Sequence, residues 1–407
     1  MSDNPGGLRY VARQPILDMR GRVHGYELLF RAGPETVFRG DGDMATRTML
    51  DNSVLFGLDK LTGGLPAFVN CTADSLTAQL VEILPPSMTV LEILETVEPT
   101  EALLAACRKL KTAGFRLALD DFEWRPELAP LVELADYIKV DFTLTNALER
   151  ARLREHLSGV TVAMIAEKVE TQEEYKQACS EGFALFQGYY FCRPILLKNR
   201  KIPANRISYL EILQILRDGQ IDIRRLSLLV KRDTSLTYRL LRLVNSPVFA
   251  IRKEVRSIEA ALMLVGEEAF RRIATLAIAS EMNANQSTEI LRMAFVRGRF
   301  CELAALLCAL DRGEQYLLGM FTLLPAMLRV PMAELAPALP LREKVREALL
   351  GAVSPESSLI RWAECYERGD WVICDGISQS YGLNRAEMAR CYTEAVVWAD
   401  AALSLAG

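Results

Sequence analysis

The first half of the chain is divided by short apolar runs, each of which has a polar or charged residue at or near its end. Seven such runs occupy residues 23–28, 67–70, 89–92, 116–121, 137–141, 162–167 and 184–187. Apolar runs of about four to eight residues are typical of buried strands. Intervening segments such as residues 101–111, followed by Gly114, are typical of helices. Because strands and helices alternate, the sequence predicts βα units that form a parallel sheet or an α/β barrel.

The residues at the ends of these runs are rich in carboxylates: Glu27, Asn70, Glu92, Asp120, Asp121, Lys139, Asp141, Glu167 and Gln187. In a barrel of parallel strands they would all lie at the same mouth, where barrel enzymes carry their active sites. Carboxylates that crowd together repel one another unless cations neutralise them. Oxygen ligands without Cys or His favour Mg²⁺, Mn²⁺ or Ca²⁺ over Zn²⁺. The pattern therefore predicts divalent metal, and two ions beside Lys139 would suit attack by water on phosphorus.

Each of these residues also has an ordinary structural interpretation when it is taken alone. An Asp-Asp pair after a strand is common at a turn or a helix cap. Lys139 can extend from a strand end to the surface, Gln187 can cap a turn, and Arg31 can pair with a surface acid. The ordered set, rather than any single residue, favours a ligand site over these alternatives.

Length and composition narrow the class of protein. A chain of 407 residues exceeds the size, about 250–300 residues, at which one core stops growing, so we expect two domains. No apolar run is long enough to cross a membrane, and the segment MSDNPGGLRY has no apolar core, which predicts a cytoplasmic protein without a membrane anchor. The net charge of -4 argues against direct nucleic-acid binding, and the absence of a CxxC pair argues against zinc.

Helical periodicity replaces the strand pattern in the second half of the chain. A basic, proline-containing stretch at residues 198–203 predicts a linker, and we place the domains at residues 1–198 and 199–407. Segments 208–217, 223–231 and 235–244 carry apolar residues three or four positions apart. Asp233 and Ser257 are candidate helix caps, and Gly266 is a candidate helix end. The second domain is therefore predicted to be all-α.

A set of motifs in the first half resembles the EAL domain family of bacterial enzymes that hydrolyse cyclic di-GMP. The motifs, within residues 8–198, are RQPILDMRGRVHGYELLFR, FVNCT, VLEILET, LALDDF, YIKVD, IAEKVET and FQGYYFCRP, in the order of the family. The resemblance implies a modified TIM barrel, two Mg²⁺ or Mn²⁺ ions, cyclic di-GMP as ligand and linear pGpG as product. The family also implies a homodimer.

The resemblance gives each polar residue an expected role. The first-metal ligands match Glu27, Asn70, Glu92 and Asp120, and a second-metal ligand matches Asp121. The expected catalytic residues are Lys139, which matches the lysine beside the attacking water, with Glu167 and Asp121. The positions that contact or support the substrate match Gln14, Arg31, Asp141, Glu170 and Gln187.

The loop after the paired aspartates departs from the family. The usual Phe-Gly-Thr/Ala-Gly sequence, which supports dimerisation and contacts a glutamate matching Glu95, is replaced by residues 122–127 (FEWRPE) without glycine. A loop that needs positive φ at glycines cannot be rebuilt with these side chains without strain, so the geometry of the second-metal site is left open. Trp124 in this loop is a packing or partner residue by its chemistry. Lys168 also stands where the family often has glycine.

Residues 233–266, with SLTYRLLRLVNSPVF and VRSIEAALMLVG, resemble the HDOD family of helical regulatory domains, and the match extends over about residues 201–395. That family lacks the metal-binding residues of its HD relatives, and residues 157–407 of this chain contain no histidine. The resemblance implies a non-catalytic domain for regulation or for binding a protein partner. Arg239 and Arg242 on one helical face are either contacts for an anionic partner or members of ordinary ion pairs.

Two hypotheses follow. The first is a cyclic di-GMP phosphodiesterase with a regulatory helical domain, which the complete set of carboxylates favours. The second is a catalytically inactive receptor or scaffold that acts through protein–protein interaction, which the altered loop favours.

Overall fold

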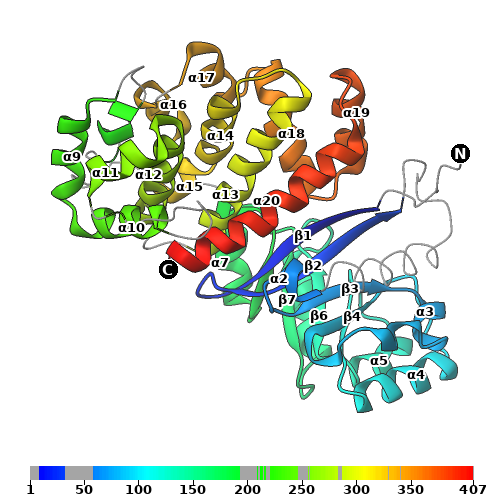
Figure 1. Ribbon diagram of the computed structural model, residues 1–407. Coiled ribbons are helices and arrows are strands. Elements are labelled where there is room, and N and C mark those ends of the chain that lie inside the picture. Colours follow the sequence, from blue (N-terminus) through cyan, green and yellow to red (C-terminus); the bar gives the residue numbers. More distant parts are fainter. Residues whose placement is uncertain are drawn as a thin grey trace, which may run out of the picture. The chain divides into compact units, whose positions relative to one another are not determined.

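The computed structural model describes residues 9–32, 58–192, 209, 211–213, 215–216, 221–245, 255, 257–282, 287–328, 330–339 and 341–406 (Figure 1). The chain forms two compact units, Met1–Tyr190 with Glu367–Gly369, and Phe191–Tyr366 with Asp370–Gly407. The linker expected at residues 198–203, and with it the predicted domain boundary, lies outside the described residues. No helix in the described ranges is both long and apolar enough to cross a membrane.

The first unit is a closed barrel of eight strands that pair in chain order (Figure 1). The strands are β1 Arg9–Asp18, β2 Val23–Ala32, β3 Ala67–Cys71, β4 Thr89–Ile93, β5 Arg116–Leu119, β6 Tyr137–Asp141, β7 Ala163–Glu167 and β8 Leu185–Gln187. The strands from β2 to β8 are parallel to one another. The predicted α/β barrel is thus confirmed.

Strand β1 was not predicted as a strand, and the expectation that all strands are parallel is wrong for it. β1 runs antiparallel to both β2 and β8, and it places Gln14 opposite Glu27 and Ile16 opposite Gln187. Arg13 and Pro15 interrupt its apolar pattern. A tight turn joins β1 to β2, and Gly21 in this turn has a φ of 72°.

The barrel interior has an apolar layer beneath a polar layer. The apolar layer comprises Ile16, Phe68, Val90, Ala118, Tyr137, Ile165 and Leu185. Side chains two positions apart on a strand share a face, so each apolar residue of β3 to β8 is followed on the same face by Asn70, Glu92, Asp120, Lys139, Glu167 or Gln187. This period of two places the polar groups at the C-terminal ends of the parallel strands.

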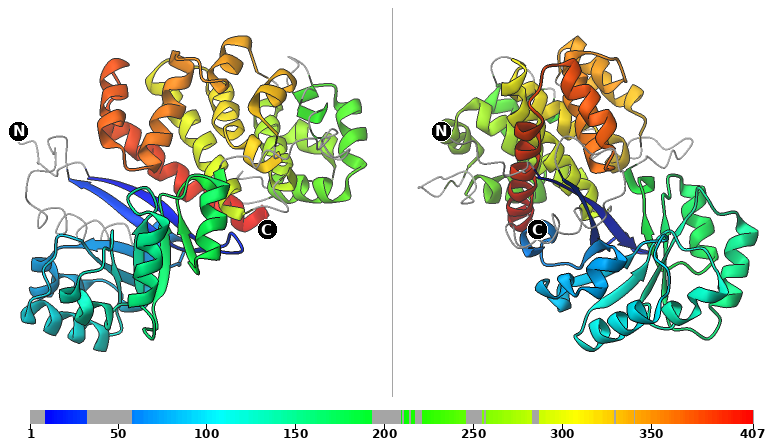
Figure 2. Two further views of the ribbon diagram at one scale, coloured as in Figure 1. Left: turned by 180° about the vertical axis from the view of Figure 1, so that it is seen from behind. Right: turned by 90° about the vertical axis from the view of Figure 1, so that its right-hand side faces the viewer.

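Helices and short 3₁₀ turns connect the strands (Figure 2). They are α2 Leu58–Thr62, α3 Ala73–Thr77, α4 Glu101–Thr112, α5 Ala129–Val132, α6 Ala147–His156 and α7 Gln172–Ser180. Thr100 caps α4 by accepting a hydrogen bond from the backbone N–H of Leu103. Capping boxes begin α6, at Asn146 and Glu149, and α7, at Thr171 and Glu174.

The described residues of the second unit form helices and no strand, which confirms the all-α prediction. The helices are α9 Ile223–Lys231, α10 Thr234–Val244, α11 Ile258–Val265, α12 Glu267–Met282, α13 Thr288–Ala304, α14 Arg312–Phe321, α15 Leu324–Leu328, α16 Met332–Leu335, α17 Glu343–Leu349, α18 Pro355–Glu367, α19 Trp371–Ser380 and α20 Arg385–Ala406. Asp233 and Ser257 cap α10 and α11 as predicted. Arg239 forms an ion pair with Glu281.

Candidate active site

The side chain of Lys139 lies at the centre of the polar layer and is only 1% exposed. Its Nζ is 3.1 Å from Oε2 of Glu27 and 2.8 Å from Oε1 of Glu92. It is also 2.7 Å from Oδ1 of Asp120 and 2.9 Å from Oε1 of Glu167. Four strands thus bring four carboxylates onto one ammonium. The interpretation of Lys139 as a surface lysine is wrong.

The cluster carries more carboxylates than its single ammonium balances. Burial raises the pKa of Glu92 well above its ordinary value and raises the pKa of Glu167 to about 8. Burial alone would lower the pKa of Lys139, but the surrounding carboxylates, Glu167 first, raise it well above its ordinary value. Lys139 therefore stays charged, and the raised pKa values of the two glutamates reflect burial and repulsion among carboxylates, which a divalent cation would relieve.

Two amides orient the carboxylate of Glu27. Nδ2 of Asn70 donates to Oε1 of Glu27 at 3.2 Å, and Nε2 of Gln187 donates to Oε2 at 2.6 Å. The same Nε2 donates to Oε1 of Gln14 at 3.0 Å, which brings β1 into the site. The hydrogen-bond donors of Asn70 and Gln187 are thus directed at protein acceptors.

Several buried oxygens of the site lack a hydrogen-bond partner. They are Oδ1 of Asn70, both carboxylate oxygens of Glu92, Oδ1 of Asp121 and Oε1 of Gln187. Oε1 of Glu92 is close to Lys139 but is not aligned for a hydrogen bond. Buried acceptors without donors are costly unless a ligand satisfies them. An all-oxygen set of this kind fits Mg²⁺ or Mn²⁺ in its chemistry.

The carboxylates face the lysine rather than one another. Among the described residues, no group of three or more His, Cys, Asp or Glu side chains is arranged as it stands to hold a metal ion. Metal binding at the predicted ligands would therefore require the Lys139 ammonium to move away from the carboxylates.

Asp141 is held by contacts within the protein. Its Oδ1 accepts hydrogen bonds from the backbone N–H and the hydroxyl of Thr143, both at 2.6 Å, and from the N–H of Leu144 at 3.3 Å. Its Oδ2 forms an ion pair with Lys168. These contacts, after burial is accounted for, lower the pKa of Asp141. Asp141 is only 3% exposed, and its role as a substrate contact stays a prediction.

The remaining predicted residues lie outside the described side chains or at exposed positions. The side chain of Arg31 lies outside the part of β2 that the structure describes, and Glu170 is exposed. Glu95 is exposed and lines a cavity of about 430 Å³ together with Asp120, Asp121 and Arg125. Two of the candidate metal ligands, Asp120 and Asp121, thus line this cavity.

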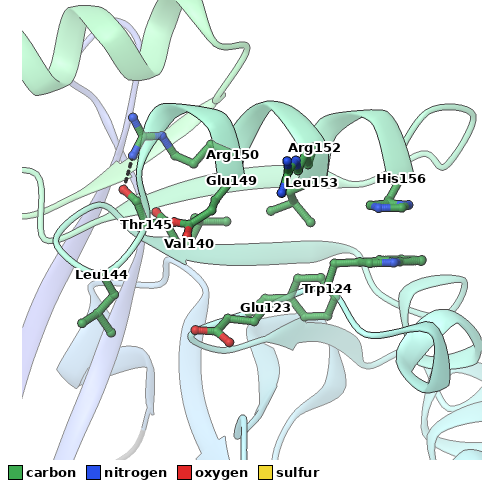
Figure 3. A pocket seen from close by; sticks show the side chains of 11 residues that line it. Glu123, Trp124, Val140, Leu144, Thr145, Glu149, Arg150, Arg152, Leu153 and His156 are labelled. Atoms are coloured by element: carbon green, nitrogen blue, oxygen red, sulfur yellow. Dashed lines mark hydrogen bonds between the residues drawn. The ribbon is translucent and has the colours of Figure 1, made fainter.

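The loop after Asp121, which lacks glycine, is held by contacts with neighbouring parts of the barrel. The backbone N–H of Phe122 donates to the carbonyl of Lys139 at 2.9 Å. The indole of Trp124 stacks on His156, with ring centroids 4.5 Å apart, beside a cavity of about 300 Å³ (Figure 3). Nη2 of Arg125 approaches the carbonyl of Glu95 at 3.5 Å.

The strain expected from the missing glycines is not found at the substituted residues. Glu123, Trp124 and Arg125 are not among the described residues with positive φ, whereas Asp121 has a φ of 39° and Lys168 a φ of 52°. The left-handed backbone therefore lies at a predicted metal ligand and at the residue after Glu167. The local backbone strain therefore lies within the site itself and not in the loop.

Comparison with known proteins identifies the family. Residues 61–194 match the EAL domain and residues 202–338 match the HDOD domain. The protein YuxH of Bacillus subtilis is 35% identical over 400 residues, which are 96% of this chain and 97% of YuxH. This chain belongs to the EAL–HDOD family.

Further relatives of the EAL–HDOD chain include an enzyme. "Cyclic di-GMP phosphodiesterase CdgJ" of Vibrio cholerae is 33% identical over 401 residues, which are 96% of this chain and 92% of CdgJ. Among solved structures, the calcium and cyclic di-GMP complex of BlrP1 from Klebsiella pneumoniae is 26% identical, with a TM-score of 0.38, and covers 46% of this chain and 57% of BlrP1.

Proposed function

We propose that the EAL barrel binds cyclic di-GMP and hydrolyses one of its phosphodiester bonds to give linear pGpG, in the cytoplasm and with two Mg²⁺ or Mn²⁺ ions. The observation that carries the proposal is the contact of Lys139 with four carboxylates, of which Glu27, Glu92 and Glu167 are buried and Asp120 directly follows a strand. Such a cluster destabilises the folded state, and a catalytic metal site would explain why the chain carries it. The name and the long match of CdgJ support the same reaction.

The residues that would hold the ions follow from the donor set. Glu27, Asn70, Glu92 and Asp120 would hold the first ion, and Asp121 would hold the second. The buried oxygens of Asn70 and Asp121 that lack a hydrogen-bond partner support this assignment. Bound divalent ions would polarise the phosphoryl group and make water more acidic.

The side chains of this chain have three tasks in the proposed reaction. The Lys139 ammonium, once released by the carboxylates, orients the attacking water or stabilises charge on the phosphoryl oxygens. Glu167, whose Oε1 lies 2.9 Å from the Nζ of Lys139, is placed to exchange a proton beside that ammonium. Gln187 keeps Glu27 in place, because its Nε2 donates a hydrogen bond to Glu27. The same Nε2 donates to Gln14, which in turn holds Gln187.

A second function, a receptor or scaffold without turnover, is favoured by one specific observation. Among the described residues, no three Asp or Glu side chains are placed to hold a metal ion, so the barrel as it stands is a charge-paired state that needs no ion. In either case we propose that the HDOD domain regulates the barrel or binds a protein partner, and that the chain forms a homodimer.

The two functions are separated by product analysis. The purified full-length chain is incubated with cyclic di-GMP and Mn²⁺ or Mg²⁺, and pGpG is measured by chromatography. We expect product from the wild type, none from Glu27→Ala, and normal turnover from Glu155→Ala, which removes an exposed carboxylate of α6. Absence of product from the wild type with both ions would exclude the enzyme. Binding of labelled cyclic di-GMP would then identify a receptor.

A further inference from the structure

The cavity of about 430 Å³ beside Asp120 and Asp121 is lined by parts of two loops, residues 94–97 after β4 and residues 122–128 after β5. Its volume lies in the range of small-molecule sites, about 300–1,000 Å³. One wall of it consists of four buried apolar side chains, Val97, Phe122, Leu128 and Leu131. A ligand with a phosphate at the two aspartates would therefore have an apolar surface beside it for a flat group.

Two opposite charges line this cavity without pairing with each other. Arg125 and Glu95 both line it, and both are exposed. Nη2 of Arg125 donates to the backbone carbonyl of Glu95 at 3.5 Å, which is the long limit of a hydrogen bond. Within the described part of the chain, the guanidinium has no carboxylate at ion-pair distance. The other N–H groups of Arg125 and the carboxylate of Glu95 are therefore free to contact a ligand.

Guanine presents the hydrogen-bonding groups that this pair of charges would bind. Its O6 and N7 accept hydrogen bonds, and they match two N–H donors of one guanidinium. Its N1–H and N2–H₂ donate hydrogen bonds, and a carboxylate such as that of Glu95 accepts them. Adenine carries an N6–H₂ donor in place of O6, so the N–H groups of Arg125 would face another donor. The combination of charges thus distinguishes the two purines.

We propose that this cavity is a guanine-specific subsite, in which Arg125 donates to O6 and N7 and Glu95 accepts from N1–H and N2–H₂. The inference rests on the proposed function, because it places a phosphate of cyclic di-GMP at Asp120 and Asp121. It adds the residues that select the base. Arg125 belongs to the loop that lacks glycine, so the altered loop has a role in binding the ligand.

The test compares two cyclic dinucleotides that differ only in their bases. Binding of cyclic di-GMP and of cyclic di-AMP to the full-length chain is measured by calorimetry in Ca²⁺, and chromatography verifies that both ligands stay intact. We expect the wild type to bind cyclic di-GMP at least about tenfold more tightly than cyclic di-AMP. Arg125→Met keeps the aliphatic stem and removes the donors. It should weaken binding of cyclic di-GMP about 10- to 100-fold and of cyclic di-AMP less than about threefold.

Glu95→Gln and Arg152→Met complete the set of variants. Glu95→Gln replaces one acceptor oxygen by a donor and should weaken binding of cyclic di-GMP selectively, by about tenfold. Arg152→Met is the matched control, because Arg152 is an exposed arginine of α6 that does not line this cavity. Its affinities should equal those of the wild type. Circular dichroism verifies folding, and Glu95→Gln remains informative if Arg125→Met fails to fold.

Two results would overturn the subsite alone. One is equal affinity of the wild type for both dinucleotides. The other is an equal change for both dinucleotides in Arg125→Met, including no change, because base recognition requires a selective loss. Selective loss in the variants without any hydrolysis by the wild type would overturn only the phosphodiesterase. A wild type that binds neither dinucleotide would overturn both the subsite and the proposed function.

Discussion

The Nζ of Lys139 lies 2.8 Å from Oε1 of Glu92, and neither side chain is more than 1% exposed. A buried carboxylate tolerates this environment only while a cation remains beside it. The same cation also pairs with Glu27, Asp120 and Glu167. Without metal, the stability of the barrel therefore depends on Lys139. With metal, the same carboxylates would bind the ions.

Replacement of Lys139 by methionine should expose this dependence. We expect the free energy of unfolding to fall by about 3–5 kcal/mol without metal, because the four carboxylates lose their counter-charge. Mn²⁺ should restore part of the loss, and hydrolysis should be abolished. Urea denaturation with and without Mn²⁺ measures the effect. Lys109→Met, at a side chain that is 56% exposed, should change stability by less than about 1 kcal/mol.

Replacement of Glu92 by glutamine should leave stability without metal intact and abolish metal binding. The change keeps the shape of the side chain and removes one of the mutually repelling carboxylates. Without metal, the free energy of unfolding should not fall. Mn²⁺ affinity and hydrolysis should both be lost. Calorimetric titration together with denaturation checks this, and a variant that still binds Mn²⁺ normally would remove Glu92 from the ligand set.

The pH dependence of barrel stability should include a contribution from His24. Burial and the nearby Arg116 lower the pKa of His24, whose ring nitrogen lies 3.0 Å from the hydroxyl of Tyr137. The unfolded chain, with an ordinary pKa of about 6.5, then binds more protons than the folded chain. Stability should therefore fall as the pH drops through about 6.5, until the folded pKa is reached. Denaturation of the wild type and His24→Asn between pH 8 and 5 tests this. Parallel curves would contradict it.

In the HDOD domain, Gly319 allows close packing of α13 and α14. A Cβ at this position would lie 2.4 Å from the carbonyl oxygen of Arg297. Gly319→Ala should therefore lower the free energy of unfolding by about 1–3 kcal/mol. Gly376 in α19 provides the matched control, because a Cβ there meets no atom within 4 Å. Gly376→Ala should be neutral or stabilise by about 0.5–1 kcal/mol. Equal effects of the two changes would contradict this packing account.

The polar layer could be predicted from the sequence because the alternation of side chains along a strand depends only on neighbouring residues. Val90 and Glu92, or Ile165 and Glu167, lie two positions apart and must share a face. The helix caps at Asp233 and Ser257 were predictable for a similar reason, since each side chain bonds the backbone three residues later. The roles assigned to the individual polar residues stay predictions.

Other features depend on contacts between distant parts of the chain. Strand β1 forms because it pairs with both β2 and β8, although Pro15 breaks its pattern. The burial of Lys139 requires carboxylates from four other positions, which local sequence does not reveal. The left-handed conformation of Asp121 had no sequence signal, and that of Lys168 was indicated only by the glycine that the family often has at this position.

Hydrolysis in water labelled with ¹⁸O tests the central claim most directly. The full-length chain is supplied with cyclic di-GMP and Mn²⁺, and the mass of the product is measured. Attack by water at phosphorus predicts pGpG that carries one ¹⁸O in its terminal phosphate, with no product from Lys139→Met or in the presence of a chelator. Unchanged cyclic di-GMP with the wild type, or unlabelled product, would contradict the account.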